Sequence, residues 1–506
     1  MAIVEKIKED LKQKIQRNLD RNYITRVLNI IGLKPILSAY GSTFTSKSDK
    51  FLNIVSIKSL KKAYSSQAPA AFGSLFFPHE FFHALEVTPF LPEVMAGFTA
   101  GLGLADQTLK EASSRWYTPD LCTFHRSASG AVEMDLFPIP KFIAVANVAC
   151  DAAQKTFYID AKKYGIEKNY YLFDVPFEKN EYSISYLAKQ FEETAEDICK
   201  KLNKKIDLGK FEEVINLSNE FRHWAIKVNE IRKKLLLYPK NFNGLNFILP
   251  FHALAGTKDA VDLYKNMYFE LKEYLTKQNN LKYNSIDKNN RNNKNNRYDK
   301  YNKNNDEDSN NNLGLSSYNI NNNFNNNNNF NENDDYNNYD NLNDITVNNE
   351  TNSDLENINP KNIKKLLWLH LKPYYKNNIF SFLEQNNFRV VFEEINYVYW
   401  PELNPKRPFE SLAKKLISHP LNGSIDNRIN AILNMVNEYN VDGTILFAHW
   451  GCRHSNGGAR IIKDTLQQRN IPTLILDGDC LNKNNSSEGQ ILTRIQGFME
   501  ILEKKK

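Results

Sequence analysis

Cysteine is scarce in this sequence, with five residues in a chain of 506. The first residues, MAIVEKIKEDLKQKIQRNLD, have a charged amphipathic pattern and lack the apolar core of a secretion signal. Few cysteines in a long chain without an export signal are typical of a reducing, cytoplasmic environment and argue against a disulfide framework. We therefore expect the thiols to be free, catalytic or metal-bound.

Other absences narrow the range of functions. No run approaches the length and apolarity of a membrane span, so no membrane partner is predicted. The net charge of +6 is not gathered into a basic stripe with interleaved aromatic residues, which disfavours nucleic-acid binding. The chain has no Walker A motif, no GxGxxG after a strand and no CxxC pair. A plain nucleotide-binding or dithiol enzyme is therefore disfavoured.

The strongest positive signal is a βαβ unit near the C-terminus. The apolar run over 443–448 predicts a buried strand, and a loop over 449–458 holds Cys452. Residues 459–468 have helical spacing, and a second apolar run covers 473–476. In open α/β sheets, ligands bind beyond the carboxyl ends of the strands, which is where this cysteine is expected.

The same order of strand, cysteine and helix occurs earlier in the chain. Residues 142–147 predict a strand, Cys150 follows it, and Asp151 is placed to cap a helix over 152–164. Cys122 lies in LCTFHRSASG, a segment rich in small and polar residues that predicts a loop. Three widely spaced cysteines are thus expected at strand-to-helix or loop positions of a sheet edge.

These patterns predict an α/β protein with two Rossmann- or flavodoxin-like open parallel sheets and an α-helical N-terminal region. The N-terminal region begins with a helix predicted over 2–28. Between 279 and 359 the composition shifts to asparagine, lysine, aspartate and tyrosine. Such a segment has too few apolar residues to offset the entropy of ordering, so we predict a disordered insert. The expected domains are a helical N-terminal region over 1–118, a first α/β domain with a helical connection over 119–278, the insert over 279–359 and a second α/β domain over 360–506.

Five motifs carry a resemblance to a known family. They are LCTFH with Cys122, VANVACDAAQKTF with Cys150, DVPF at 174–177, HWGCRHSNGG with Cys452, and LDGDCLNKNNSSEGQ with Cys480. Outside the insert, the chain resembles the 2-hydroxyacyl-CoA dehydratase component D family, which also includes benzoyl-CoA reductase subunits and double-cubane cluster proteins. The resemblance implies a [4Fe-4S] cluster bound by Cys122, Cys150 and Cys452, with one iron left open. Iron–sulfur clusters require thiolates, and helix N-termini supply N–H groups that stabilise them.

The resemblance also implies an activity and partners. A separate ATP-hydrolysing iron–sulfur activator would deliver one electron, and the cluster would pass it to the carbonyl of an (R)-2-hydroxyacyl-CoA thioester. The resulting ketyl radical would lose the 2-hydroxyl group and then the 3-proton, and return of the electron to the cluster would leave the 2-enoyl-CoA. Family enzymes are mostly heterodimers of paralogous subunits, of which one binds substrate and the other relays electrons. The sequence does not distinguish these two roles.

A second hypothesis belongs to another class of protein. The same three cysteines would hold a double-cubane [8Fe-9S] cluster in a homodimeric electron-transfer protein or reductase, or the chain would be a subunit like those of benzoyl-CoA reductases. The iron and sulfide content of the purified protein would separate a fused eight-iron cluster from two four-iron clusters.

The remaining candidates have competing interpretations. Any one cysteine, taken singly, fits a buried structural thiol, and only the surrounding motifs favour ligation. Cys199 lies within a predicted helix and is interpreted as a core residue, whereas Cys480 ends a strand and is left open between a structural thiol and a position behind the ligands. Glu80 resembles a family glutamate that exchanges protons with the substrate, but it also fits a helix N-terminal glutamate that complements the dipole. The histidines expected to hydrogen-bond the cluster or its loops are His125, His449 and His454.

Overall fold

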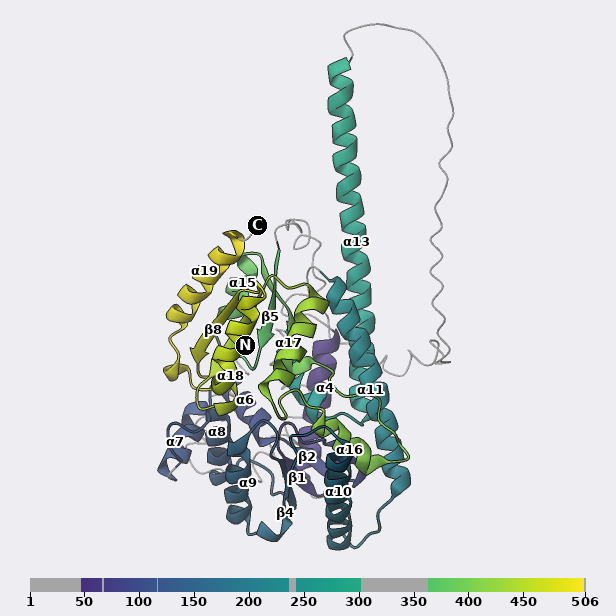
Figure 1. The fold of residues 1–506 in the computed structure, drawn as a ribbon, viewed down its shortest axis with the longest axis vertical. Helices are drawn as coiled ribbons and strands as arrows, with labels where there is room; N and C mark the ends of the chain where they lie inside the picture. The colour runs from purple at the N-terminus through teal and green to yellow at the C-terminus, as the bar shows by residue number, and fades with distance from the viewer. Residues whose placement is uncertain (1–46, 66–67, 116, 236–242, 302–362, 505–506) are drawn as a thin grey trace, which may run out of the picture. The chain divides into compact units, whose positions relative to one another are not determined.

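The computed structural model describes most of the chain outside its two ends and the asparagine-rich segment (Figure 1). The described ranges are 47–65, 68–115, 117–235, 243–301 and 363–504. The helix predicted over 2–28 therefore lies outside the described residues. By its contacts the chain divides into one compact unit of residues 1–275 and 358–506 and a second unit of residues 276–357. Both sheets and the candidate site belong to the first unit.

The predicted insert falls largely on residues that the structure does not describe. The helix α13, Lys258–Tyr301, continues past position 279, where disorder was expected to begin. From 302 to 362 the insert lies outside the described residues. The first part of the segment is therefore helical in backbone, and the disorder of the remainder stays a prediction.

The first sheet has four parallel strands in the order β2-β1-β3-β4. The strands are β1 Ala70–Gly73, β2 Thr88–Phe90, β3 Phe142–Ala146 and β4 Tyr170–Phe173. β3 confirms the strand predicted over 142–147, and all five of its residues are buried because helices cover both faces. Figure 1 shows α8 and α9 on one side of this sheet and α10 on the other. β1 and β2 come from the region expected to be helical, so the first sheet draws strands from both sides of position 118.

The second sheet is also four-stranded and parallel, in the order β6-β5-β7-β8. Its strands are β5 Lys364–Leu369, β6 Phe388–Glu393, β7 Gly443–His449 and β8 Thr473–Gly478. β7 and β8 confirm the two strands predicted near the C-terminus, because each is an apolar run bounded by turn residues. The two parallel sheets with flanking helices confirm the predicted α/β class.

The helices that precede the second sheet are α4 Lys47–Tyr64, α5 Glu80–Ala84, α6 Pro92–Gly101, α7 Ala105–Ser114, α8 Thr123–Glu133, α9 Asp151–Tyr164, α10 Glu181–Lys201, α11 Leu208–Lys234, α12 Ile248–Ala253 and α13. Those that accompany it are α15 Ile379–Gln385, α16 Pro408–Ile417, α17 Ile425–Tyr439, α18 Arg453–Gln468 and α19 Glu488–Lys504. Within the described ranges, no helix combines the length and the apolar composition needed to span a bilayer.

The hydrophobic core links the two sheets. One face of β3, including Phe142, packs in a cluster with α10, α11 and α16, and the other face, including Ile143, packs in a second cluster. That second cluster also contains Ile445 and Phe447 of β7, so residues of both sheets share one apolar core. The carboxyl ends of β3 and β7 are thereby held in one rigid body, which is what a site built from both requires.

Two predicted loops are helical, and this changes where the cysteines lie. The segment after Cys122 was expected to be a loop but forms α8, and α18 begins at Arg453 within the loop predicted over 449–458. α8 is buried along nearly its whole length and α18 is buried on one side, and this packing outweighs the poor intrinsic helix propensity of their serine, glycine and histidine residues. Cys122 and Cys452 therefore stand at the start of a helix.

Candidate active site

Three cysteines occupy the same position relative to three different helices. Cys122 is the N-cap residue of α8, Cys150 that of α9, and Cys452 that of α18. At this position a side chain faces the first, unpaired N–H groups of the helix, where the helix dipole favours negative charge. At Cys452 the contact is a hydrogen bond, in which the Ser455 N–H donates to Sγ over 3.4 Å.

The three N-cap cysteines line one cavity with a volume of about 140 Å³. The loop of Cys452 reaches the segment of Cys122 because Gly451 has no side chain. Gly451 has a φ of +74°, and a Cβ added there would lie 2.5 Å from the backbone nitrogen of Cys122. The structure thus brings together the three residues that the motifs singled out, although they are far apart in the sequence. In the described part of the chain, no three His, Cys, Asp or Glu side chains enclose a position for a single metal ion.

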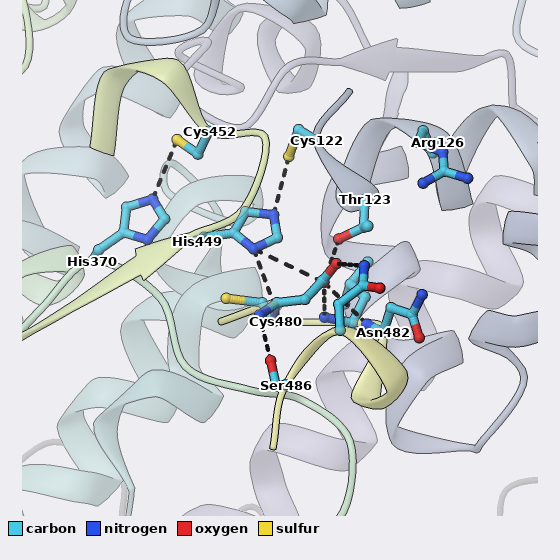
Figure 2. A network of polar contacts seen from close by, with 12 residues as sticks. Cys122, Thr123, Arg126, His370, His449, Cys452, Cys480, Asn482 and Ser486 are labelled. Atoms are coloured by element: carbon cyan, nitrogen blue, oxygen red, sulfur yellow. Dashed lines mark hydrogen bonds and ion pairs between the residues drawn. The ribbon is translucent and has the colours of Figure 1, made fainter. Parts of the chain in front are cut away.

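His449 contacts Cys122, and its tautomer follows from its two neighbours. The backbone N–H of Cys480 donates to Nδ1 over 3.1 Å, so Nδ1 carries no proton. Burial lowers the pKa of His449 to about 4, so the ring is neutral and its proton is on Nε2. Nε2 lies 3.3 Å from the Cys122 sulfur and therefore donates to it (Figure 2).

The other two cysteines also face histidines. His125 Nε2 lies 3.1 Å from the Cys150 sulfur, and its Nδ1 lies 3.1 Å from the Thr156 hydroxyl. His370 Nε2 lies 3.7 Å from the Cys452 sulfur, as Figure 2 shows. Each sulfur at this site therefore has an imidazole nitrogen nearby, which suits a group that must stabilise negative charge on sulfur.

Sequence analysis did not single out His370. The residue follows β5 directly with a φ of +69°, which is uncommon for a residue with a side chain. Its position at the carboxyl end of a strand is the one signal that could have identified it, since the same position drew attention to Cys150 and Cys452. His454, which was expected near the site, does line the cavity.

Burial dominates the electrostatics of the three thiols. It raises the pKa of Cys150 to about 12 and that of Cys452 to about 11, and it holds the pKa of Cys122 well above its usual value. The neighbouring sulfurs of Cys452 and Cys150 raise the pKa of Cys122 further, whereas N–H groups at the helix start lower it. Near neutral pH these thiols stay protonated unless a positive charge joins them, and a bound metal centre supplies such a charge.

The loop after β8 holds His449 in place. The carboxylate of Asp479 accepts a hydrogen bond from the Thr123 hydroxyl over 2.6 Å and from two backbone N–H groups of its own loop. Figure 2 shows that the contact from Cys480 to His449 is made by the backbone of Cys480. Cys480 is buried but is not among the described residues that line the cavity. Cys199 is buried in α10 and packs in the core, as expected of a structural thiol.

Glu80 is also placed away from the described lining of the cavity. It is buried at the start of α5, where it pairs with Lys415 and accepts a hydrogen bond from the Ser218 hydroxyl over 2.6 Å. Burial acts to raise the pKa of Glu80, but the charge of Lys415 and the hydrogen bonds from Lys415 and Ser218 outweigh it and lower the pKa. A direct contact between Glu80 and a group in the cavity therefore stays a prediction.

Two carboxyl groups that sequence analysis passed over do line the cavity. Glu93 lies in the first turn of α6, accepts the Leu75 N–H over 3.0 Å and has one oxygen 4.0 Å from His125 Nε2. Burial raises the pKa of Glu93 to about 7. Glu394 binds the Arg428 guanidinium through two hydrogen bonds of 2.7 and 2.8 Å. Of the two, Glu93 is the group able to gain or lose a proton near neutral pH.

Removing the Ser218 hydroxyl tests the structural account of Glu80. Ser218→Ala is expected to lower the free energy of unfolding by about 1.5–3 kcal/mol, because it removes a hydrogen bond to a buried charged group. A carboxyl group whose pKa is lowered by folding contributes stability above its unfolded pKa of 4.5 and loses it as the pH falls. Urea unfolding should therefore show a larger loss at pH 7 than at pH 4.

A serine on the surface provides the matched control for this substitution. Ser114 is exposed and donates to the Glu111 carbonyl within α7, so Ser114→Ala should change stability by less than about 0.5 kcal/mol. Equal losses for Ser114→Ala and Ser218→Ala, or a loss at Ser218 that does not depend on pH, would contradict the buried ion pair.

Comparison with known proteins places this geometry in a family. A family model described as 2-hydroxyglutaryl-CoA dehydratase, D-component, matches residues 74–298 and 330–502, which is more than half of the chain. The chain is 22% identical over 448 residues to the (R)-phenyllactyl-CoA dehydratase alpha subunit of Clostridium sporogenes, covering 85% of this chain and 88% of that subunit. It is 24% identical over 223 residues to the (R)-2-hydroxyisocaproyl-CoA dehydratase alpha subunit of Clostridioides difficile, covering 42% of this chain and 54% of that subunit. The matched ranges contain all three N-cap cysteines, and the resemblance carried by the motifs is confirmed: this chain belongs to the 2-hydroxyglutaryl-CoA dehydratase D-component family.

Proposed function

We propose that this chain is an iron–sulfur subunit of an (R)-2-hydroxyacyl-CoA dehydratase, which removes water from the thioester and releases the 2-enoyl-CoA. The observation that carries the proposal is the convergence of Cys122, Cys150 and Cys452 on one cavity in a chain of this family. Two relatives are alpha subunits of (R)-2-hydroxyacyl-CoA dehydratases, which supports a CoA thioester as substrate and a second subunit as partner.

The donor set fits a [4Fe-4S] cluster. Iron–sulfur clusters are held by thiolates, and hydrogen bonds to the sulfurs tune their reduction potential. Here three thiols stand at three helix N-termini, and each has a histidine nitrogen within 3.7 Å. Three protein ligands for four irons leave one iron open for the substrate, so Cys122, Cys150 and Cys452 would hold the cluster with a position free toward the cavity.

The side chains around this position have separate roles in the proposed reaction. A bound cluster would supply a low-potential electron to the thioester carbonyl after an ATP-hydrolysing activator had delivered it. His449 holds its N–H toward the Cys122 sulfur, and the apolar lining of the cavity keeps water from the reacting thioester. Glu93 lines the cavity and titrates near neutral pH, so we assign to it the proton that leaves the 3-position of the substrate. Glu80 would act on this chemistry indirectly, through the packing of α5.

The proposal is tested with the assembled enzyme. The chain is co-expressed with a paralogous subunit, purified without oxygen, and supplied with the activator, ATP and an (R)-2-hydroxyacyl-CoA. We expect about four iron atoms per chain and ATP-dependent formation of the 2-enoyl-CoA, followed by its ultraviolet absorbance. An iron-loaded complex that forms no enoyl-CoA with an active activator would overturn the dehydratase assignment, and about eight iron atoms shared in one fused cluster per dimer would favour the double-cubane class.

A further inference from the structure

Away from the cysteines, the cavity is lined mainly by aromatic and aliphatic side chains. The larger of these residues are Phe76, Phe124, Tyr374, Tyr397, Tyr399 and Met435. His419 stands between two of the rings, with its centroid 4.6 Å from that of Phe76 and 4.5 Å from that of Tyr399. These three rings form a continuous apolar wall of the kind that packs against a hydrocarbon group.

The described lining of the cavity offers no free positive charge to an anionic group. Among the described residues that line it, Arg428 is the one lysine or arginine, and Glu394 neutralises its guanidinium through two hydrogen bonds. The Arg428 side chain is 2% exposed and that of Glu394 is 14% exposed, so the guanidinium itself is buried. Away from the cysteines, the lining contains two histidines, His252 and His419; burial lowers the pKa of His252 to about 3 and holds that of His419 well below its usual value.

We propose, on the basis of the proposed function, that the 2-hydroxyacyl group accepted here ends in a hydrocarbon ring or branched chain and not in a second carboxylate. A carboxylate on the acyl chain would enter a buried space without a free cation to pair with it. It would also meet the negative charge of Glu93 whenever that carboxyl group is deprotonated. Burying an unpaired charge costs far more free energy than a small difference in the fit of a hydrocarbon group. The site should therefore discriminate strongly between thioesters with a hydrocarbon end and thioesters with a second carboxylate.

Equilibrium binding of three thioesters to the anaerobic, assembled complex tests this inference without turnover. The ligands are (R)-2-hydroxy-4-methylpentanoyl-CoA, (R)-2-hydroxy-3-phenylpropanoyl-CoA and (R)-2-hydroxyglutaryl-CoA, measured by calorimetry without the activator and with CoA as the reference. We expect at least one hydrocarbon thioester to bind about 100-fold more tightly than the dicarboxylate. Equal or tighter binding of the dicarboxylate would overturn the inference and leave the dehydratase proposal standing, whereas a failure of all three thioesters to bind better than CoA would overturn both.

A pair of neighbouring glutamates supplies a matched set of variants. Glu394→Gln releases the Arg428 guanidinium toward the cavity and should reduce the discrimination against the dicarboxylate by about tenfold or more. Glu393 instead pairs with Arg232 over 2.8 Å, and it does not belong to the described lining of the cavity. Glu393→Gln should therefore leave the discrimination unchanged although it also breaks a buried ion pair.

The outcomes of the variants distinguish an effect of the Glu394 charge on binding from a loss of folded structure. Circular dichroism and the thermal midpoint show whether each variant is folded, and the comparison of thioesters on the unmodified complex needs no variant at all. Glu394→Asp, which keeps the charge, should restore the discrimination. If Glu394→Gln and Glu393→Gln change the discrimination equally, or if neither changes it, Arg428 and Glu394 do not set the specificity and the inference is overturned.

Discussion

Serine at Cys122, Cys150 or Cys452 is expected to remove most of the iron from the anaerobically purified complex, whereas serine at Cys199 should leave the iron bound. The three N-cap cysteines line one cavity, and a cluster with only three protein ligands has none to spare. Losing a further thiolate should therefore make the cluster labile and not merely shift its potential. Iron analysis and the visible absorption of the cluster, recorded beside far-ultraviolet circular dichroism, measure the loss on a folded chain.

Cys199 and Cys480 are the controls for this experiment. Cys199→Ser buries a hydroxyl in the core on the inner face of α10, so it should lower stability by about 1–3 kcal/mol and keep the iron. Cys480→Ser should also keep the iron, because its backbone N–H still donates to His449 and its own side chain is not part of the described lining. A changed reduction potential in Cys480→Ser would show that the sulfur lies behind the ligands. Loss of the cluster in Cys199→Ser together with its retention in Cys452→Ser would contradict the ligand assignment.

Much of the fold could be predicted because its signals are local. β3 and β7 are apolar runs that need no partner to be recognised. The start of α9 was predicted to within one residue: the helix begins at Asp151, and Cys150 is its N-cap in place of the predicted Asp151. The strands β1 and β2 could not be found in this way, since AAFG and TPF are too short and contain glycine or proline. β1 is a strand because it pairs with β3, and β2 because it pairs with β1, which is information from the tertiary structure.

The candidate site, like the fold, has residues that the sequence predicts from local signals and residues that only the tertiary structure reveals. The motifs brought forward three cysteines and two of the histidines that contact them, His125 and His449, from residue types and positions alone. They did not reveal that Thr123–Glu133 is helical, because small and polar residues in this segment suit a loop better than a helix. α8 is stabilised by burial along nearly its whole length, and Gly130 within it allows the backbone to pass close to Thr108 of α7. His370 and Glu93 reach the cavity only through the packing of β5 and α6.

Gly451→Ala is expected to disrupt the site although it keeps all five cysteines. The residue has a φ of +74°, in the left-handed region that disfavours a side chain, and the added Cβ would lie 2.5 Å from Cys122 N and 2.8 Å from Asp120 O. These are backbone atoms, so either the Cys452 loop or the start of α8 must move. We expect a loss of about 2–5 kcal/mol in the free energy of unfolding and an iron content well below that of the unmodified complex.

Gly457→Ala is the matched control for the same chemical change in the next turn of the chain. Gly457 lies inside α18, and a Cβ added there meets no atom within 4 Å. Alanine should therefore stabilise the helix by about 0.5–1 kcal/mol and leave the iron content unchanged. Urea unfolding and iron analysis of the two variants measure both effects. If Gly451→Ala retains full iron and stability, the close approach of the Cys452 loop to Cys122 is not needed for the site, and the convergence of the three cysteines on one cavity loses its structural support.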